Sequence, residues 1–237
     1  MFKEKKTDTG LVYYSDLLNG IEHYFTTRES NVEDNFDGWC KYLGIDGTSF
    51  IHPTQTHTPN IKTAIIGVSD YPDTDSLILN NHNQAIYLRF ADCTPVIIYD
   101  KKGNIGAIAH AGWRGTVEGI VPKTVNKMRE LTNSDIKDYY IAIGPAIGQC
   151  CYQVGEEVIT AVKKSVKDES NLITPDNRID LKGVNARQLT EIGIPAENID
   201  ICPFCTSCRS DLFYSYRKEN GTDKRHNAII KLKRATA

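Results

Sequence analysis

Residues Ala91 to Gly115 have the sequence "ADCTPVIIYDKKGNIGAIAHAGWRG". Two β-rich apolar runs, Pro95–Asp100 and Ile105–His110, flank the polar connection KKGN and predict a β-hairpin. A hairpin of this loop length places Cys93 opposite a residue between His110 and Gly112, roughly 5 Å away. The pairing register leaves open whether the side chains share one face, because a shift of one residue reverses the face. A shared metal ion and ordinary core packing are the two interpretations.

The other segments mix strand and helix patterns without a regular strand–helix alternation. Further strands are predicted at Gln84–Phe90, at Tyr139–Gly144 and, as a pair around an Asn-Gly-Thr-Asp turn, within Leu212–Lys233. Helices are predicted at Val32–Gly44, at Gly155–Val166, at Asn185–Pro195 and in a segment that starts near Gly119 or bends at Pro122. We therefore expect an α+β fold, a single domain over residues 1–237 with a mixed β-sheet core flanked by helices.

Composition excludes several classes of partner. The formal net charge of −2 at pH 7 gives no electrostatic reason to bind nucleic acid or an anionic membrane. No run approaches the roughly 18 apolar residues that span a bilayer, and the basic N-terminus lacks the apolar stretch of a signal peptide. Seven cysteines cannot all pair in disulfides, which favours a reducing compartment. We expect a cytoplasmic monomer.

A further candidate ligand lies upstream, in the polar, proline-broken stretch HPTQTHTPNI. Its two histidines, His52 and His57, fall in a segment that favours a loop, where ligands are common. Two histidines and one cysteine suit Zn²⁺ and leave a fourth coordination position for water or substrate. The chain has six histidines, so spacing alone leaves many such trios open.

Five motifs in combination resemble those of the laccase-domain (polyphenol oxidase, or peptidoglycan-editing factor) family of purine nucleoside phosphorylases. In chain order they are PTQTH, FADCTPVIIYD, IAHAGWRGTVEGI, AIGPAIGQCCYQVGEEV and LFYSYRKENGTDKR, and the similarity runs from about Phe25 to Leu232. The resemblance implies a metal site formed by the histidine of Gln-x-His, the cysteine of Ala-Asp-Cys and the histidine of His-Ala-Gly-Trp. In this chain these metal ligands and catalytic residues are His57, Cys93 and His110.

The resemblance also implies an activity. The family is known for phosphorolysis of adenosine, inosine, guanosine and methylthioadenosine, and for deamination of adenosine. Zn²⁺ at the site would lower the pKa of bound water towards about 7 and provide hydroxide for attack on purine C6, whereas phosphate would be the nucleophile in phosphorolysis. The implied partners are purine nucleosides and phosphate. The implied cofactor is Zn²⁺, with Cu²⁺ as the alternative metal of a His₂Cys set.

Three other functions fit parts of the pattern. A copper-dependent polyphenol oxidase matches the family name, although four-electron oxygen reduction needs more imidazoles than six histidines supply. A non-catalytic zinc-binding module in cell-wall maintenance would normally have four protein ligands instead of three. A metal-free hydrolase would use a histidine to activate Cys93 as the nucleophile.

Three arginines are candidates for substrate binding. Arg114 lies in a glycine-flanked turn that leads into a helix, whose N-terminal amides could hold an oxyanion. Arg28 matches an arginine of the family, although Glu-Ser replaces the two glycines that usually follow it. Arg217 matches the first of two paired arginines, and lysine replaces the second. Ordinary solvated arginines are the alternative for all three.

The segment CPFCTSC places Cys202, Cys205 and Cys208 at a spacing typical of metal ligands. The adjacent Cys150 and Cys151 offer a fourth ligand, or they pack after the Gly-Pro-Ala-Ile-Gly turn. The sequence leaves open whether these cysteines bind a second metal ion.

Overall fold

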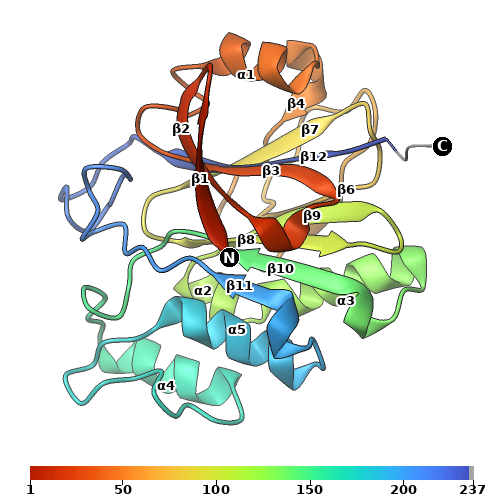
Figure 1. The fold of residues 1–237 in the computed structure, drawn as a ribbon. Coiled ribbons are helices and arrows are strands. Elements are labelled where there is room, and N and C mark those ends of the chain that lie inside the picture. The colour runs from red at the N-terminus through yellow and green to blue at the C-terminus, as the bar shows by residue number, and fades with distance from the viewer. Residues whose placement is uncertain (235–237) are drawn as a thin grey trace.

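The computed structural model describes residues 1–234, and within them two six-stranded mixed sheets pack face to face (Figure 1). The first sheet has the strand order β1 (Phe2–Thr7), β2 (Gly10–Ser15), β3 (Ile21–Thr26), β12 (His226–Leu232), β7 (Ala85–Phe90) and β4 (Phe50–Ile51). The second has the order β11 (Ile199–Ile201), β10 (Tyr139–Ile143), β8 (Thr94–Asp100), β9 (Ile105–Ala111), β6 (Ser76–Leu79) and β5 (Ile61–Thr63). The pairs β4–β7, β5–β6 and β10–β11 are parallel, and the other pairs are antiparallel.

The main hydrophobic core lies between the sheets. Fully buried side chains of the first sheet meet those of the second, among them Phe25, Leu88, Ile230, Leu77, Ile97 and Ile108. Every residue of β8 and β9 is buried, because helices cover the outer face of their sheet as well. This explains why the two strands read as continuous apolar runs.

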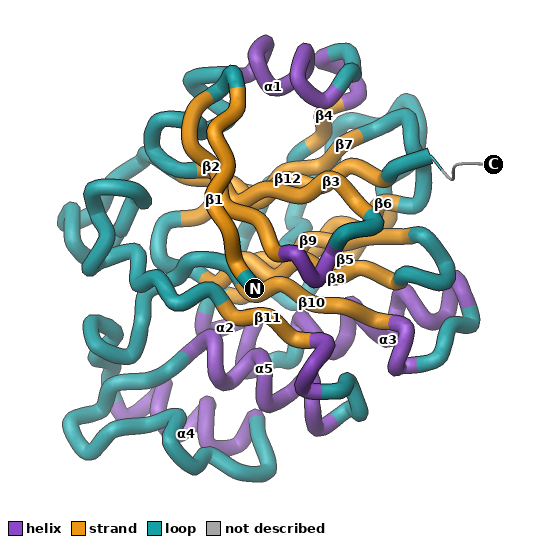
Figure 2. Tube along the Cα trace, viewed as in Figure 1, coloured by secondary structure: helices purple, strands orange, loops and turns teal. Residues whose placement is uncertain are grey.

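Helices cover both outer faces, as the purple segments of Figure 2 show. The helix α1 (Phe36–Leu43) covers the first sheet through Trp39 and Leu43. On the second sheet lie α2 (Trp113–Val117), α3 (Ile120–Thr132) and α5 (Leu181–Glu191), with α4 (Glu156–Ser165) packed against α2 and α5. The predicted α+β fold, a single domain with a mixed β core flanked by helices, is confirmed. None of the helices within residues 1–234 has the length and apolar character that crossing a membrane requires.

The hairpin at the centre of the sequence forms as expected. Thr94 pairs with Ala111 and Pro95 with His110, so continuation of the register sets Cys93 against Gly112. The turn between the strands is fixed by the side chain of Asp100, which accepts hydrogen bonds from two backbone amides of the KKGN connection.

One helix start agrees with a predicted alternative, and another lies earlier than predicted. Gly119 adopts φ +72°, a left-handed conformation that separates α2 from α3, so the helix starts there and does not bend at Pro122. Pro122 lies in the first turn of α3, where its missing N–H costs no helical bond. The helix predicted from Asn185 begins at Leu181, because Asp180 accepts a hydrogen bond from the amide of Gly183 and caps it.

The prediction of two strands within Leu212–Lys233 is wrong for its first half, because only β12 forms. Arg28 holds the earlier part as a turn: its amide donates to the carbonyl of Leu212, its Nε to that of Phe213, and its guanidinium pairs with Glu219. Glu219 also accepts the amide of Ser215. These contacts with a distant residue override the strand propensity of the aromatic residues.

Candidate metal centre

The side chains of His57, Cys93 and His110 converge from three separate segments. His57 lies in the loop between β4 and β5, Cys93 directly precedes β8, and His110 is the penultimate residue of β9. One donor atom from each side chain lies within 4.8 Å of the other two, and the two imidazole centroids are 4.8 Å apart. The chain therefore brings together two nitrogen donors and one sulfur donor, as one shared ion requires. Their role as metal ligands stays a prediction.

A buried carboxylate that sequence reasoning missed lies behind His110. Asp75 is fully buried at the start of β6, and its Oδ1 accepts a hydrogen bond from Nδ1 of His110 at 2.7 Å. The amide of His110 also donates to the carbonyl of Asp75, because β6 and β9 are neighbouring strands. With Nδ1 held in this way, Nε2 of His110 is the nitrogen left for an ion.

The same carboxylate shapes the loop that carries His57. The amides of Thr56, His57 and Thr58 all donate to Asp75, at 3.0, 3.0 and 2.9 Å. His57 itself adopts φ +65°, which is uncommon for a residue with a side chain and lets three successive amides face one anion. Gln55 fixes the other side of the loop, since its side-chain amide exchanges two hydrogen bonds with the backbone of Arg89.

The charges of the site stabilise one another in the absence of a metal ion. Burial raises the pKa of the Cys93 thiol, but the attraction of His110 and the hydrogen bonds of both histidines outweigh it, so the pKa lies below its ordinary value. Burial lowers the pKa of His110, but Cys93 and Asp75 outweigh it and raise the pKa. Asp75 keeps a pKa of about 2 despite its burial, because His110 and the loop amides hydrogen-bond to its carboxylate. The site thus favours a thiolate, the form that binds metals.

Gly112 provides the space in which the three ligands meet. A Cβ atom at this position would lie 3.1 Å from Sγ of Cys93 and 3.3 Å from Cδ2 of His57. Any side chain here would push the cysteine and the histidine apart. The first glycine of the Gly-Trp-Arg-Gly motif therefore allows the side chains of Cys93 and His57 to approach each other closely.

The three side chains line one wall of a pocket with a volume of about 700 Å³. The other lining residues are His52, Pro53, Thr54, Gln55, Arg89, Ala91, Asp92, Ile147, Tyr152, Tyr216, Arg217 and Arg225. Asp92 ties three of these segments together: its carboxylate accepts the Thr206 hydroxyl and the amide of Arg217, both at 2.7 Å, and its carbonyl accepts the amide of Ile147. Hydrogen bonds to one aspartate thus fix the wall opposite the histidines.

Of the three arginines predicted to bind substrate, Arg217 lines this pocket. Arg114 is exposed on α2 and stacks on the Trp113 ring at 4.3 Å, and Arg28 pairs with Glu219 at 2.6 Å outside the pocket lining. Burial and the Cys93 thiolate raise the pKa of Tyr152 to about 12, and the charges of Arg217 and Arg114 oppose this. The substrate-binding role of all three stays a prediction.

Sequence reasoning missed two further arginines of the pocket. Arg89 lies in β7 and pairs with Glu33 at 2.6 Å, so its charge is largely neutralised. Arg225 directly precedes β12 and donates to the carbonyls of Thr222 and Lys224, and none of its hydrogen-bond partners within residues 1–234 is a carboxylate. The signal in the sequence was its place at the end of the motif LFYSYRKENGTDKR.

The second group of cysteines that the structure brings together differs from the group that the spacing of CPFCTSC suggests. Cys205 and Cys208 lie with Cys150 and Cys151, and their sulfur atoms are all within 4.8 Å of one another. Cys202, which the sequence left as a further candidate, is fully buried outside this group.

Comparison with known proteins identifies the family. The family model described as multi-copper polyphenol oxidoreductase laccase matches residues 13–233. The chain belongs to this laccase family. A Synechocystis protein named purine nucleoside phosphorylase is 34% identical over 217 residues, covering 80% of this chain and 82% of that protein. A Clostridium acetobutylicum protein of the same name is 31% identical over 230 residues, covering 97% and 94%.

Solved structures with the laccase-family fold superpose over nearly the whole chain. The crystal structure of the Bacillus licheniformis hypothetical protein YfiH gives a TM-score of 0.89 at 28% identity, covering 97% of this chain and 99% of that one. The crystal structure of YlmD from Geobacillus stearothermophilus gives 0.88 at 26% identity, covering 98% and 99%. The resemblance found in the motifs is therefore confirmed at the level of family and fold.

Proposed function

We propose that this protein is a zinc-dependent purine nucleoside phosphorylase that also deaminates adenosine. The observation that carries the proposal is the convergence of His57, Cys93 and His110 on one wall of a pocket that also holds Arg217 and Arg225. The names of the curated relatives support it. The proposed substrates are adenosine, inosine, guanosine and methylthioadenosine together with phosphate, and the products are the free base and ribose 1-phosphate.

The donor set fits zinc. Two imidazole nitrogens and a thiolate are common ligands of Zn²⁺, and a carboxylate behind a zinc-bound histidine is the usual supporting partner. His110 would bind through Nε2, because Asp75 occupies Nδ1, and Cys93 through Sγ. Three protein ligands leave one position towards the pocket. When bound, the ion supplies Lewis acidity, which polarises an oxygen atom of the substrate or of water.

The pocket residues supply binding and orientation. A cleft of about 700 Å³ lies in the usual range for small-molecule sites and would hold a nucleoside beside phosphate. Arg217 and Arg225 attract phosphate, while Tyr152 and Ile147 offer apolar surface to the purine ring. In phosphorolysis a phosphate oxygen bonds to the anomeric carbon, the glycosidic C–N bond breaks, and the base leaves with the electron pair and takes up a proton. In deamination, water replaces the amino group at C6 and ammonia leaves.

The small number of histidines at the metal centre supports this function over a copper-dependent polyphenol oxidase. Within residues 1–234, three or more potential metal-ligating side chains gather at two places, and only the site at Cys93 contains histidines. His23 and His226 are buried outside both groups. A centre of several coppers needs more imidazoles than this. A non-catalytic zinc module is less well supported, because three ligands that face a pocket leave an open position.

The proposal is tested by incubating the purified protein with adenosine and following adenine, inosine and ribose 1-phosphate, with and without phosphate. We expect adenine and ribose 1-phosphate only when phosphate is present, with ribose 1-phosphate equal to the sum of adenine and the hypoxanthine released from inosine. We expect inosine in both cases, and loss of all products after zinc is removed with a chelator. Turnover that survives complete metal removal would favour the Cys–His hydrolase instead. No product from the zinc-loaded protein would contradict the proposal.

A further inference from the structure

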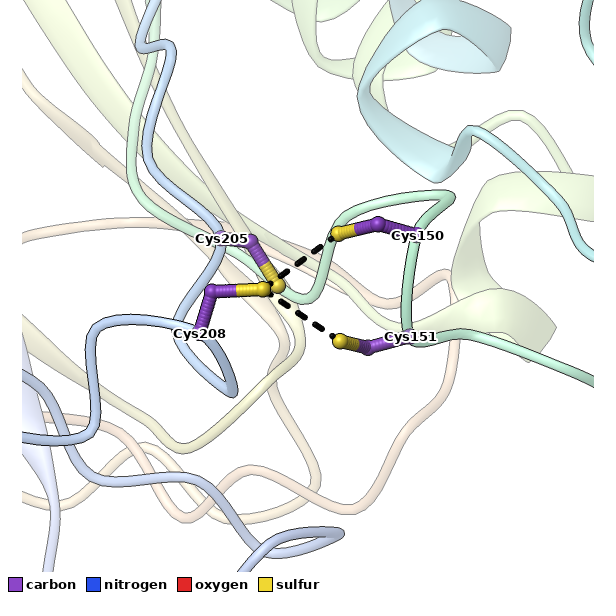
Figure 3. Close-up of side chains that lie close together, drawn as sticks. All are labelled: Cys150, Cys151, Cys205 and Cys208. Carbon is purple, nitrogen blue, oxygen red and sulfur yellow. Dashed lines mark hydrogen bonds between the residues drawn. The ribbon is translucent and has the colours of Figure 1, made fainter.

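Four cysteine sulfurs form a second cluster, away from His57 and His110. Cys150 and Cys151 lie in the turn after β10, and Cys205 and Cys208 lie in the segment after β11 (Figure 3). All four sulfurs lie within 4.8 Å of one another. Figure 3 shows the side chains of the two segments pointing towards one common point.

The distances suit an ion better than disulfides. Sγ of Cys208 lies 3.6 Å from that of Cys150 and 3.5 Å from that of Cys151, whereas a disulfide bond needs about 2.05 Å, and all four cysteines are free. A tetrahedral zinc ion with sulfur ligands at about 2.3 Å separates those sulfurs by about 3.8 Å. Two of the sulfur–sulfur distances in the cluster are therefore within a few tenths of an ångström of the distance in a tetrahedral zinc site.

The backbone holds the two segments in register without any ion. Ala146 and Cys205 form an isolated parallel bridge, in which the amide of Thr206 donates to the carbonyl of Ala146 at 3.0 Å. The amide of Cys151 donates to the carbonyl of Gly148, which closes the turn that points the adjacent cysteines into the cluster. The ligands are thus preorganised.

Gly148 is adapted to the cluster. Its amide donates to Sγ of Cys205 at 3.1 Å, a hydrogen bond that stabilises a thiolate. A Cβ atom at this position would lie 3.1 Å from Cβ of Cys205 and 3.3 Å from Sγ of Cys150.

We propose that Cys150, Cys151, Cys205 and Cys208 bind a structural zinc ion. A closed set of four protein ligands is typical of structural zinc, and each bound cysteine releases its thiol proton to solvent. The ion would link two segments near the pocket. The pocket residues Ile147 and Tyr152 lie on either side of Cys150 and Cys151, and Arg217 donates to the carbonyl of Gln153, next to Tyr152. Its role is to hold this wall of the pocket in place.

The test is the zinc content of the full chain, purified under reducing conditions, by elemental mass spectrometry. In a Cys93→Ala background, which disrupts the other centre, we expect about one zinc per chain to remain. Adding Cys208→Ala should remove that zinc, while Cys202→Ala, a buried cysteine of the same segment, should leave it. Exposed Cys208 is chosen because its loss removes no core packing.

A second measurement leaves all four cysteines of the cluster in place, so it does not depend on the folding of a Cys208 variant. Cobalt bound to the Cys93→Ala protein should show intense thiolate-to-cobalt absorption of a four-sulfur site, which zinc then abolishes. Absence of zinc from the Cys93→Ala protein, iron in its place, or a disulfide between Cys208 and either adjacent cysteine after purification under reducing conditions would overturn the proposal. These outcomes leave the phosphorylase function untouched, since that function depends on Cys93.

Discussion

Nδ1 of His110 lies 2.7 Å from Oδ1 of Asp75, and the same carboxylate accepts the amides of three successive residues around His57. One buried side chain therefore orients the ring of one proposed ligand and the backbone of another. Cys93 needs no such partner, since the hairpin register fixes its position.

Replacing Asp75 by asparagine should weaken zinc binding by about 10- to 100-fold, because the amide cannot accept every hydrogen bond of the carboxylate. An amide NH₂ facing the backbone donors also costs stability, by about 1–3 kcal/mol. Zinc affinity by competition with a chelator and urea unfolding measure the two effects. Asp73→Asn is the control, because Asp73 bonds to the same loop through Thr56 and Asn60 but not to His110. Equal losses in both variants would contradict a specific role for Asp75.

Gly112→Ala should lower zinc retention, because the added Cβ would lie 3.1 Å from Sγ of Cys93. The matched control is Gly155→Ala. Both glycines are helix N-caps with extended backbone, but a Cβ at Gly155 meets no atom within 4 Å. Elemental analysis and melting temperature of the two variants check this. Full zinc content in Gly112→Ala would show that the ligands tolerate a wider spacing.

The hairpin and the helix faces could be predicted because their signals are local. The β-rich apolar runs Pro95–Asp100 and Ile105–His110 predict two strands wherever they lie in the fold. Asp75 could not be predicted as part of the site, since only the pairing of β6 with β9 sets it beside His110. The strand prediction for the segment after Leu212 was wrong for the same reason, because the contacts of this segment with Arg28 join residues far apart in the chain.

Arg217→Gln and Arg225→Gln should each raise the KM for phosphate by about tenfold, because each removes a charge-assisted contact with the anion. The KM for the nucleoside should change less. Arg129→Gln, on the exposed face of α3, is the control. Initial rates at varied phosphate and fixed adenosine measure the effect. An unchanged KM for phosphate in both pocket variants would place the anion elsewhere.

Stability should fall with acidification partly through His23. Burial lowers its pKa to about 4, and its Nε2 accepts the amide of Ser15 at 3.0 Å. As pH falls below the ordinary pKa of 6.5, His23 becomes protonated in the unfolded chain, but in the folded chain it stays neutral down to about pH 4. The folded state therefore loses stability as pH falls from 6.5 to about 4. His23→Gln should reduce the slope of unfolding free energy against pH by about 1.4 kcal/mol per pH unit. Urea unfolding at several pH values checks this, and an unchanged slope would contradict it.

The proposed function requires Cys93 as a ligand of the metal ion in the pocket. The direct test is to measure bound zinc, melting temperature and adenosine turnover on one preparation of Cys93→Ala, with Cys202→Ala as the buried-cysteine control. We predict loss of one zinc equivalent, a fold largely intact because Cys93 precedes its strand, and loss of both phosphorolysis and deamination. A structural cysteine would instead cost about 1–3 kcal/mol of stability with activity per folded molecule retained. Full nucleoside turnover by metal-depleted Cys93→Ala protein would contradict the account.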